Sequence, residues 1–269
     1  MPPTFRALLL TPLLLGGCLF AQQPPPRRIY LRQAVVHHWV NSAIVIANDP
    51  RPLRQAIIAL RNEYGWIVDY EDPPYFSDFD LFDSTAPKWR ADHPTERGAR
   101  SVGGGFFQSE YPETPDASSS PFEEEAILNK VVADYNNSGN PGKFRLLKEA
   151  PGRFSVVGES VKDDKGRDVQ VPSLLDTVVF VPEGERIPSE SVRAILDALS
   201  ARTGVKCFYN TFGNDTLGLI RIPSGGHTSA RSLLLAVFKA TSRPFSMDWF
   251  YITDANEYAL SLRLPWSPQ

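Results

Sequence analysis

Residues 53–70 read LRQAIIALRNEYGWIVDY, and residues 192–209 read VRAILDALSARTGVKCFY. In each stretch apolar side chains recur at helical spacing, a glycine follows, and a short alternating segment comes next. When the two are superposed, four positions of the first stretch match four of the second: Leu53, Ile57, Leu60 and Gly65 fall on Val192, Leu196, Leu199 and Gly204. A glycine at this point can end a helix in the left-handed conformation. The two stretches therefore predict a duplicated helix–glycine–strand motif.

The flanking residues repeat the same order of elements. A short apolar strand precedes each helix, at Ala43–Ala47 and at Thr177–Val181, and a further strand, a helix and a closing hairpin follow. The expected third strands are Phe106–Tyr111 and Leu219–Ile222. We therefore expect an α+β fold of two tandem β-α-β-β-α-β-β units, with helices packed on one face of small mixed sheets.

Composition shifts divide the chain further. The segment 71–119 is rich in Pro, Asp, Ser and Gly, and 161–175 is polar and charged. The expected organisation is a signal peptide over 1–21, a proline-rich leader over 22–42, a first unit over 43–160 with a long insertion at 71–119, a linker over 161–175, and a second unit over 176–269.

The first residues have the pattern of an export signal. Arg6 supplies positive charge, Ala7–Leu15 is apolar but shorter than the roughly 20 residues that cross a bilayer, and small residues follow. Two cleavage sites compete, because Leu15-Gly16-Gly17-Cys18 resembles a lipobox that would make Cys18 a lipidation site, whereas Ala21 suits an ordinary signal peptidase. Either reading predicts a periplasmic, outer-membrane-associated or secreted protein with no transmembrane span in the mature chain.

The charge balance excludes one class of partner. The chain carries 28 Lys and Arg against 31 Asp and Glu, a formal net charge of −3, and no long run of either sign. Binding to nucleic acid requires a basic surface that neutralises phosphates. We therefore expect no nucleic-acid partner.

The insertion 71–119 is unusually aromatic for a linker. Large aromatic side chains left in water forgo burial worth about 1.5–3 kcal/mol each, so part of this segment is expected to pack on the fold. It is interpreted as an irregular cover of the sheet or, alternatively, as a ligand-binding loop. In the second case the candidate ligand contacts are Tyr75, Phe76, Trp89, Phe106 and Phe107.

No residue pattern predicts catalysis, a cofactor or a metal. The four histidines (His37, His38, His93 and His227) lack metal-ligand spacing, and no Gly-x-Ser-x-Gly or phosphate-loop motif occurs. Acidic pairs such as Asp69/Glu71 and Asp78/Asp80 are interpreted as solvated, and Cys207 as a small buried residue. No catalytic, cofactor-binding or metal-binding residue is assigned.

The segment from Ile195 to Leu262 resembles the short N-terminal domain shared by secretins and TonB-dependent receptors. The resemblance lies in the helix Ala194–Thr203, Gly204, the strand Val205–Tyr209 and the helix Ala230–Arg243. A weaker copy covers 43–157. The resemblance implies a periplasmic, non-catalytic domain used for protein–protein contacts, without cofactors.

Two functions follow as hypotheses. The first is a non-catalytic binding or scaffolding module of the cell envelope, whose exposed strand edges or aromatic insertion engage another envelope protein. The alternative is a polysaccharide- or peptidoglycan-binding protein, or a hydrolase that uses the aromatic and acidic residues of 71–119. The sequence favours the first and predicts that the protein is not an enzyme.

Overall fold

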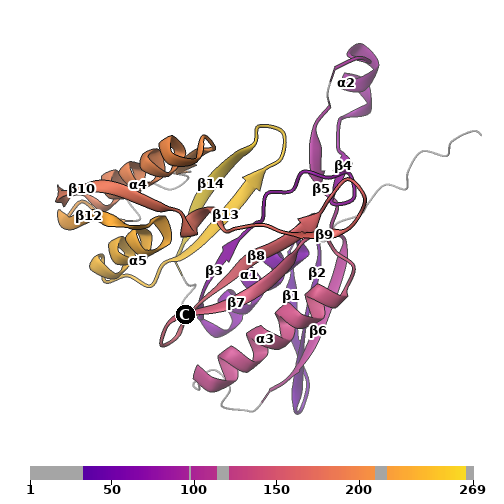
Figure 1. Ribbon diagram of the computed structural model, residues 1–269. Helices are drawn as coiled ribbons and strands as arrows, with labels where there is room; N and C mark the ends of the chain where they lie inside the picture. The colour runs from indigo at the N-terminus through magenta and orange to yellow at the C-terminus, as the bar shows by residue number, and fades with distance from the viewer. Residues whose placement is uncertain (1–32, 97, 114–120, 210–216, 265–269) are drawn as a thin grey trace, which may run out of the picture.

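The computed structural model describes residues 33–96, 98–113, 121–209 and 217–264. Within these residues the chain is a mixed α+β structure with two lobes side by side, as Figure 1 shows, and the predicted α+β class is confirmed. The expected signal peptide and Cys18 lie outside the described residues. No helix of the described part is both long and apolar enough to cross a membrane.

The first lobe, indigo to pink in Figure 1, contains the first of the two opening sequence stretches. The predicted helix is confirmed: α1 ends at Tyr64, and Gly65 follows with a φ of 72°. The lobe consists of β2 (Ser42–Asn48), α1 (Pro52–Tyr64), β3 (Ile67–Glu71), β6 (Phe106–Pro112), α3 (Pro121–Asn137), β7 (Lys143–Ala150) and β8 (Arg153–Lys162).

The second lobe, orange to yellow, contains the second stretch. Here α4 ends at Thr203, and Gly204 also has a φ of 72°. Its elements are β10 (Val178–Arg186), α4 (Pro188–Thr203), β11 (Lys206–Tyr209), β12 (Ile222–Ser229), α5 (Ala230–Ala240), β13 (Ser246–Ile252) and β14 (Glu257–Arg263).

The strand pairings in the two lobes correspond. In the first, β2 pairs antiparallel with β6, β3 pairs parallel with β8, and β7 pairs antiparallel with β8. In the second, β10 pairs antiparallel with β12, β11 pairs parallel with β14, and β13 pairs antiparallel with β14. The buried residues likewise form two clusters, one centred in each lobe.

One sheet runs through both lobes. Its order is β11-β14-β13-β3-β8-β7, and β9 (Asp168–Gln170) pairs with β8 as a seventh strand. The lobes join where β13 runs parallel to β3, with Asp248 opposite Tyr70 and Trp249 opposite Glu71. The sequence predicted separate small sheets, because nothing in a local pattern indicates pairing across 178 residues.

The helices lie between two sheets and not on one face of a single sheet, which differs from the expectation. In the first lobe α1 and α3 contact both the large sheet and the small sheet β1-β2-β6, and in the second α4 contacts both β11 and β10. The reason is that β2 pairs only with β1 and β6, and β10 only with β12, among the described strands. These small sheets cover the helical side that would otherwise face water.

The segments named as leader, linker and insertion all contain ordered elements. Within the leader, β1 (Val35–His38) pairs antiparallel with β2. Within the linker lie β9 and a 3-10 helix, Leu174–Asp176. The insertion forms an arm of β4 (Leu81–Asp83), α2 (Pro87–Asp92) and β5 (Arg100–Val102), with α2 at the tip in Figure 1.

The third strand of the second lobe lies later than predicted. The sequence indicated Leu219–Ile222, but β12 spans Ile222–Ser229 and includes two glycines with positive φ. A side chain on Gly225 would place its Cβ 2.4 Å from the carbonyl oxygen of Pro182, where β10 has a bulge. The glycine-rich run lies within β12, and the close approach of the β10 backbone explains why position 225 is glycine.

Candidate functional site

The structure separates the five predicted ligand contacts. Tyr75 is buried beside Gly142 of the first lobe, in a cluster that extends into the second lobe, and Phe107 is buried in the first-lobe core, each at most 2% exposed. Phe76 and Phe106 are exposed, and Phe106 faces the opposite side of β6 from Phe107. Trp89 lies on the arm. The structure therefore gives no single aromatic surface formed by all five.

Trp89 does line a hollow of its own. The hollow measures about 520 Å³ and is bounded by the arm residues Thr85, Ala86, Gly98 and Ala99 and by Asp254 from the turn between β13 and β14. One face of the indole stacks on His93 with ring centroids 4.5 Å apart. Here a predicted aromatic contact lines a concave surface.

The acidic pairs are more buried than the sequence indicated. Asp69, Glu71 and Asp80 are buried, whereas Asp78 is exposed. Asp69 accepts three hydrogen bonds from Arg153, at 3.0, 2.9 and 2.8 Å, and one, at 2.7 Å, from the backbone N–H of Met247. The interpretation of Asp69, Glu71 and Asp80 as solvated is wrong, because β3 lies inside the shared sheet and Asp80 is buried where it accepts from the backbone N–H of Lys162.

Two further hydrogen bonds join the lobes beside β3, one to Glu71 and one to Asp72. Glu71 accepts from Arg231 of α5 over 2.5 Å and from Ser173 over 2.6 Å. Just after β3, Asp72 accepts from Arg51 over 2.5 Å and from the backbone N–H of Tyr251 over 3.1 Å. The carboxylates on β3 and just after it therefore accept the hydrogen bonds that join the lobes.

Asp248 of β13 is the most heavily bonded of these carboxylates. It is fully buried and accepts from Arg61 over 2.6 Å, and from Arg54 and Arg263 over 3.0 Å each. Burial by itself raises the pKa of Asp248, but the positive charges of the three arginines outweigh it and lower that pKa to about 2. The carboxylate is therefore ionised at neutral pH.

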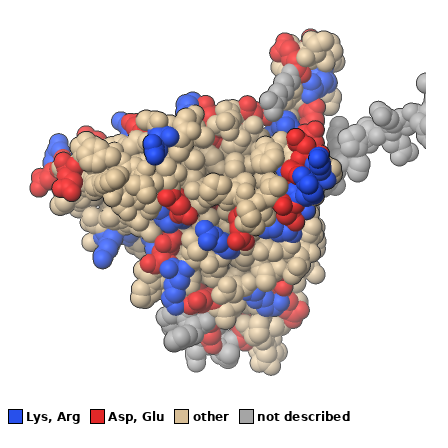
Figure 2. All heavy atoms as spheres, in the orientation of Figure 1, with Lys and Arg blue, Asp and Glu red and all other residues tan. Residues whose placement is uncertain are grey.

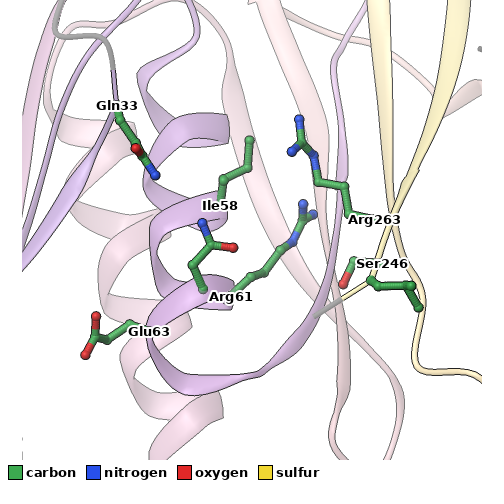
Figure 3. Close-up of a pocket in the computed structure, with 8 residues that line it drawn as sticks. Gln33, Ile58, Arg61, Glu63, Ser246 and Arg263 are labelled. Atoms are coloured by element: carbon green, nitrogen blue, oxygen red, sulfur yellow. The ribbon is translucent and has the colours of Figure 1, made fainter. Parts of the chain in front are cut away.

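A pocket opens beside Asp248 at the junction of the lobes (Figure 3). Its volume is about 560 Å³. Helix α1 lines one side, and β13 and β14 line the other, so that the guanidinium groups of Arg61 and Arg263 both reach toward Asp248. The lining residues are Gln33, Ile58, Arg61, Asn62, Glu63, Ser246, Arg263 and Leu264. No local sequence pattern indicates this pocket, because its walls come from α1 and from β13 and β14, which lie far apart in the chain.

The small sheet of the second lobe has an open edge. In the first lobe β1 pairs with one edge of β2, whereas β10, in the corresponding place, pairs only with β12 among the described strands. Val178 and Phe180 of β10 are 51% and 66% exposed. This edge therefore combines an unpaired backbone with exposed apolar side chains.

One hydrogen bond shows which backbone N–H and C=O groups of β10 point to β12 and which point to the open edge. Ala230 N donates to the carbonyl of Thr177 over 3.0 Å, so the backbone groups of Thr177 face β12. Hydrogen-bonding direction alternates along an antiparallel strand, so those of Val178 and Phe180 face the open edge. Pro182, which has no N–H, ends the usable edge after Val181.

Ser224 and His227, the one serine and histidine close together in a glycine-rich run, do not form a catalytic pair. Ser224 receives a hydrogen bond from Ser191 at 2.8 Å, whereas His227 packs edge-on against Phe180. An odd spacing along β12 places the two side chains on opposite faces. In the described part of the chain, no three His, Cys, Asp or Glu side chains are grouped so that they could hold a metal ion.

Comparison of the chain with protein-family profiles, with curated proteins and with solved structures gives no match. The surface charges indicate no class of partner. On the face in Figure 2, basic and acidic side chains are interspersed, and neither sign forms a patch.

Proposed function

We propose that this protein is an exported, non-catalytic module of the cell envelope that binds another protein by accepting one of its strands on β10. The observation that carries the proposal is the open edge at Val178–Val181, with Val178 and Phe180 exposed beside it. Unpaired backbone groups on an edge strand are a ready template for strand addition.

The first lobe supplies a precedent for the geometry. There β1 adds to β2 over four residues, with Val35 opposite Ile46 and His38 opposite Ala43. The open part of β10 also comprises four residues before Pro182. The partner segment is therefore an extended, antiparallel stretch of about four residues whose apolar side chains cover Val178 and Phe180.

We further propose that the two lobes are degenerate tandem copies of a unit similar to the short N-terminal domain of secretins and TonB-dependent receptors. Corresponding strand pairings and the left-handed glycines Gly65 and Gly204 support this. The resemblance also supports a periplasmic, outer-membrane-associated or secreted location. The mass of the mature N-terminus distinguishes lipidation at Cys18 from cleavage after Ala21.

Photo-crosslinking in the native envelope tests the strand-addition proposal. A benzoylphenylalanine at position 178 should give a discrete protein adduct, and the same group at Asp197, exposed on α4, should not. Phe180→Pro should lower the adduct yield by about fivefold, because it removes the outward N–H and leaves the bonds between β10 and β12 intact.

The matched variant is Phe180→Ala, which keeps the N–H and removes only the apolar side chain. It should retain more adduct than Phe180→Pro. An adduct whose yield is unchanged in Phe180→Pro, or no adduct at position 178, contradicts strand addition.

The hollow beside Trp89 favours a second candidate, binding of an envelope polysaccharide. Its indole is positioned next to Asp254, and an aromatic face beside a polar group suits a sugar ring. In this case Trp89→Ala should abolish binding to peptidoglycan fragments, and Phe180→Pro should not affect it. If fragments are cleaved by wild type and not by Trp89→Ala, the alternative becomes a hydrolase.

A further inference from the structure

We infer that the pocket at the lobe junction binds a carboxylate carried next to an aliphatic group, on a peptide or on a small organic acid. The pocket and the open edge of β10 are separate features built from different residues. This inference therefore does not depend on strand addition.

The charges around the pocket are unbalanced. Three guanidinium groups, those of Arg54, Arg61 and Arg263, bond to the carboxylate of Asp248, and Glu63 supplies one further carboxylate in the lining, so positive charge is in excess by one. Arg61 is only 3% exposed, so its charge is poorly hydrated. A buried charge with a shared counter-ion is costly, and a second anion nearby would offset that cost.

Hydrogen-bond donors remain for such an anion. The Nε of Arg61 is buried below the pocket and has no hydrogen-bond partner in the described structure, so it adds positive charge there, and the donors open to a ligand are those of Arg263. Arg263 donates to Asp248 through Nε, which leaves its two terminal NH₂ groups for a ligand. Guanidinium groups match carboxylates in planar, paired geometry, and Gln33 and Asn62 add neutral donors at the rim.

The remaining walls select the size and charge of the ligand. Ile58 and Leu264 give the pocket an apolar side, and its volume of about 560 Å³ suits a small ligand or one or two side chains. Glu63 also lines it, with its carboxylate 3.1 Å from His38. This negative charge disfavours polyanions such as polyphosphates, so a single carboxylate fits best.

Binding to the full-length protein can be measured with three defined probes: acetyl-Leu-Asp-amide, isovalerate, and the neutral acetyl-Leu-Asn-amide. The readout is the NMR signal of each arginine Nε–H, together with the dissociation constant. We expect the acidic peptide to shift the Arg61 and Arg263 signals at concentrations up to about 10 mM, and the neutral peptide to leave them unchanged.

Two substitutions separate charge from geometry. Arg263→Gln should weaken binding of the acidic peptide by about tenfold. Arg263→Lys should weaken it less, because lysine keeps the positive charge but lacks the planar pair of N–H donors of a guanidinium group. Arg202→Gln, which removes one charge from an exposed position on α4, is the matched control and should have no effect.

The outcomes are distinct. A shift with the acidic peptide alone assigns the carboxylate to a peptide ligand, and a shift with isovalerate as well assigns it to small organic acids; both support the inference. No shift of either arginine with any probe overturns it, as does equal binding of the acidic and neutral peptides. None of these results affects the cross-linking at β10.

Discussion

Arg61 of α1 and Asp248 of β13 lie 187 residues apart in the chain, yet Nη1 of Arg61 donates to Oδ1 of Asp248 over 2.6 Å. Both side chains are buried, and the bond joins the first lobe to the second. Arg54 and Arg263 reach the same carboxylate from α1 and β14. The relative position of the lobes is thus held by charge pairs in addition to the pairing of β3 with β13.

Asp248→Asn should destabilise the protein strongly. The substitution leaves three arginines without their shared counter-ion, and breaking a buried pair in this way costs about 3–5 kcal/mol. Urea unfolding followed by far-UV circular dichroism measures the loss. Asp197→Asn, on the exposed face of α4, should change the free energy of unfolding by less than about 0.5 kcal/mol. Equal effects of the two substitutions would show that the junction bonds contribute nothing.

Acid should remove the same stabilisation. Because the folded-state pKa of Asp248 is lowered to about 2, its contribution is complete above its ordinary value of 3.8 and is lost as pH falls through about 2. The difference in free energy of unfolding between wild type and Asp248→Asn should therefore be constant above pH 4 and shrink below it. A difference that persists unchanged at pH 2 would contradict the assignment.

Glu124, in the first turn of α3, should have the opposite pH dependence. Burial raises its pKa to about 7, so its contribution is most favourable below 4.5 and is lost as pH rises through about 7. Glu124→Gln should be more stable than wild type by about 1–2 kcal/mol at pH 8 and about equal to it at pH 5. The neighbouring Glu125→Gln, which loses a bond to Lys148, serves as the control.

His38 should stabilise the position of β1 on β2 more strongly at low pH. Its hydrogen bond to Glu113, at 2.7 Å, raises its pKa, with Glu63 adding to the effect and burial opposing it. Stabilisation by His38 is present below 6.5 and is lost as pH rises through the raised value. Protection of the β1 amides against hydrogen exchange should fall over this range in wild type but not in His38→Gln. The adjacent His37→Gln should behave as wild type.

Cys207 should be unreactive in the folded protein. Burial raises the pKa of its thiol to about 11, so the thiolate is scarce at pH 8. Ellman's reagent should label it only on the time scale of unfolding, and urea should speed the labelling. Rapid labelling in native buffer would contradict the burial of β11 against α4.

The elements that depend on local patterns could be predicted from the sequence. A helix before Gly65 and the left-handed conformation of Gly65 were predicted, because the spacing of apolar residues and a terminal glycine are local features of the sequence. The closing hairpin of the first lobe, formed by β7 and β8, was predicted from local patterns as well. The α+β class was also predicted correctly.

What the sequence could not supply was contact between distant segments. Arg61 continues a helical pattern in which a charged residue is expected to face water, and its buried partner Asp248 lies on a strand of the other lobe. The pairing of β3 with β13 likewise has no local signal. The five candidate aromatic contacts do not form one surface, because Tyr75 and Phe107 are buried in two different clusters.

Amide hydrogen exchange at β10 tests the central claim most directly. In the purified protein, the N–H groups of Val178 and Phe180 should exchange much faster than those of Ile44 and Ile46, which face β1. On addition of the partner identified by cross-linking, Val178 and Phe180 should become as protected as Ile44 and Ile46. Protection of these two amides in the isolated protein, or none in the complex, would contradict recognition by strand addition.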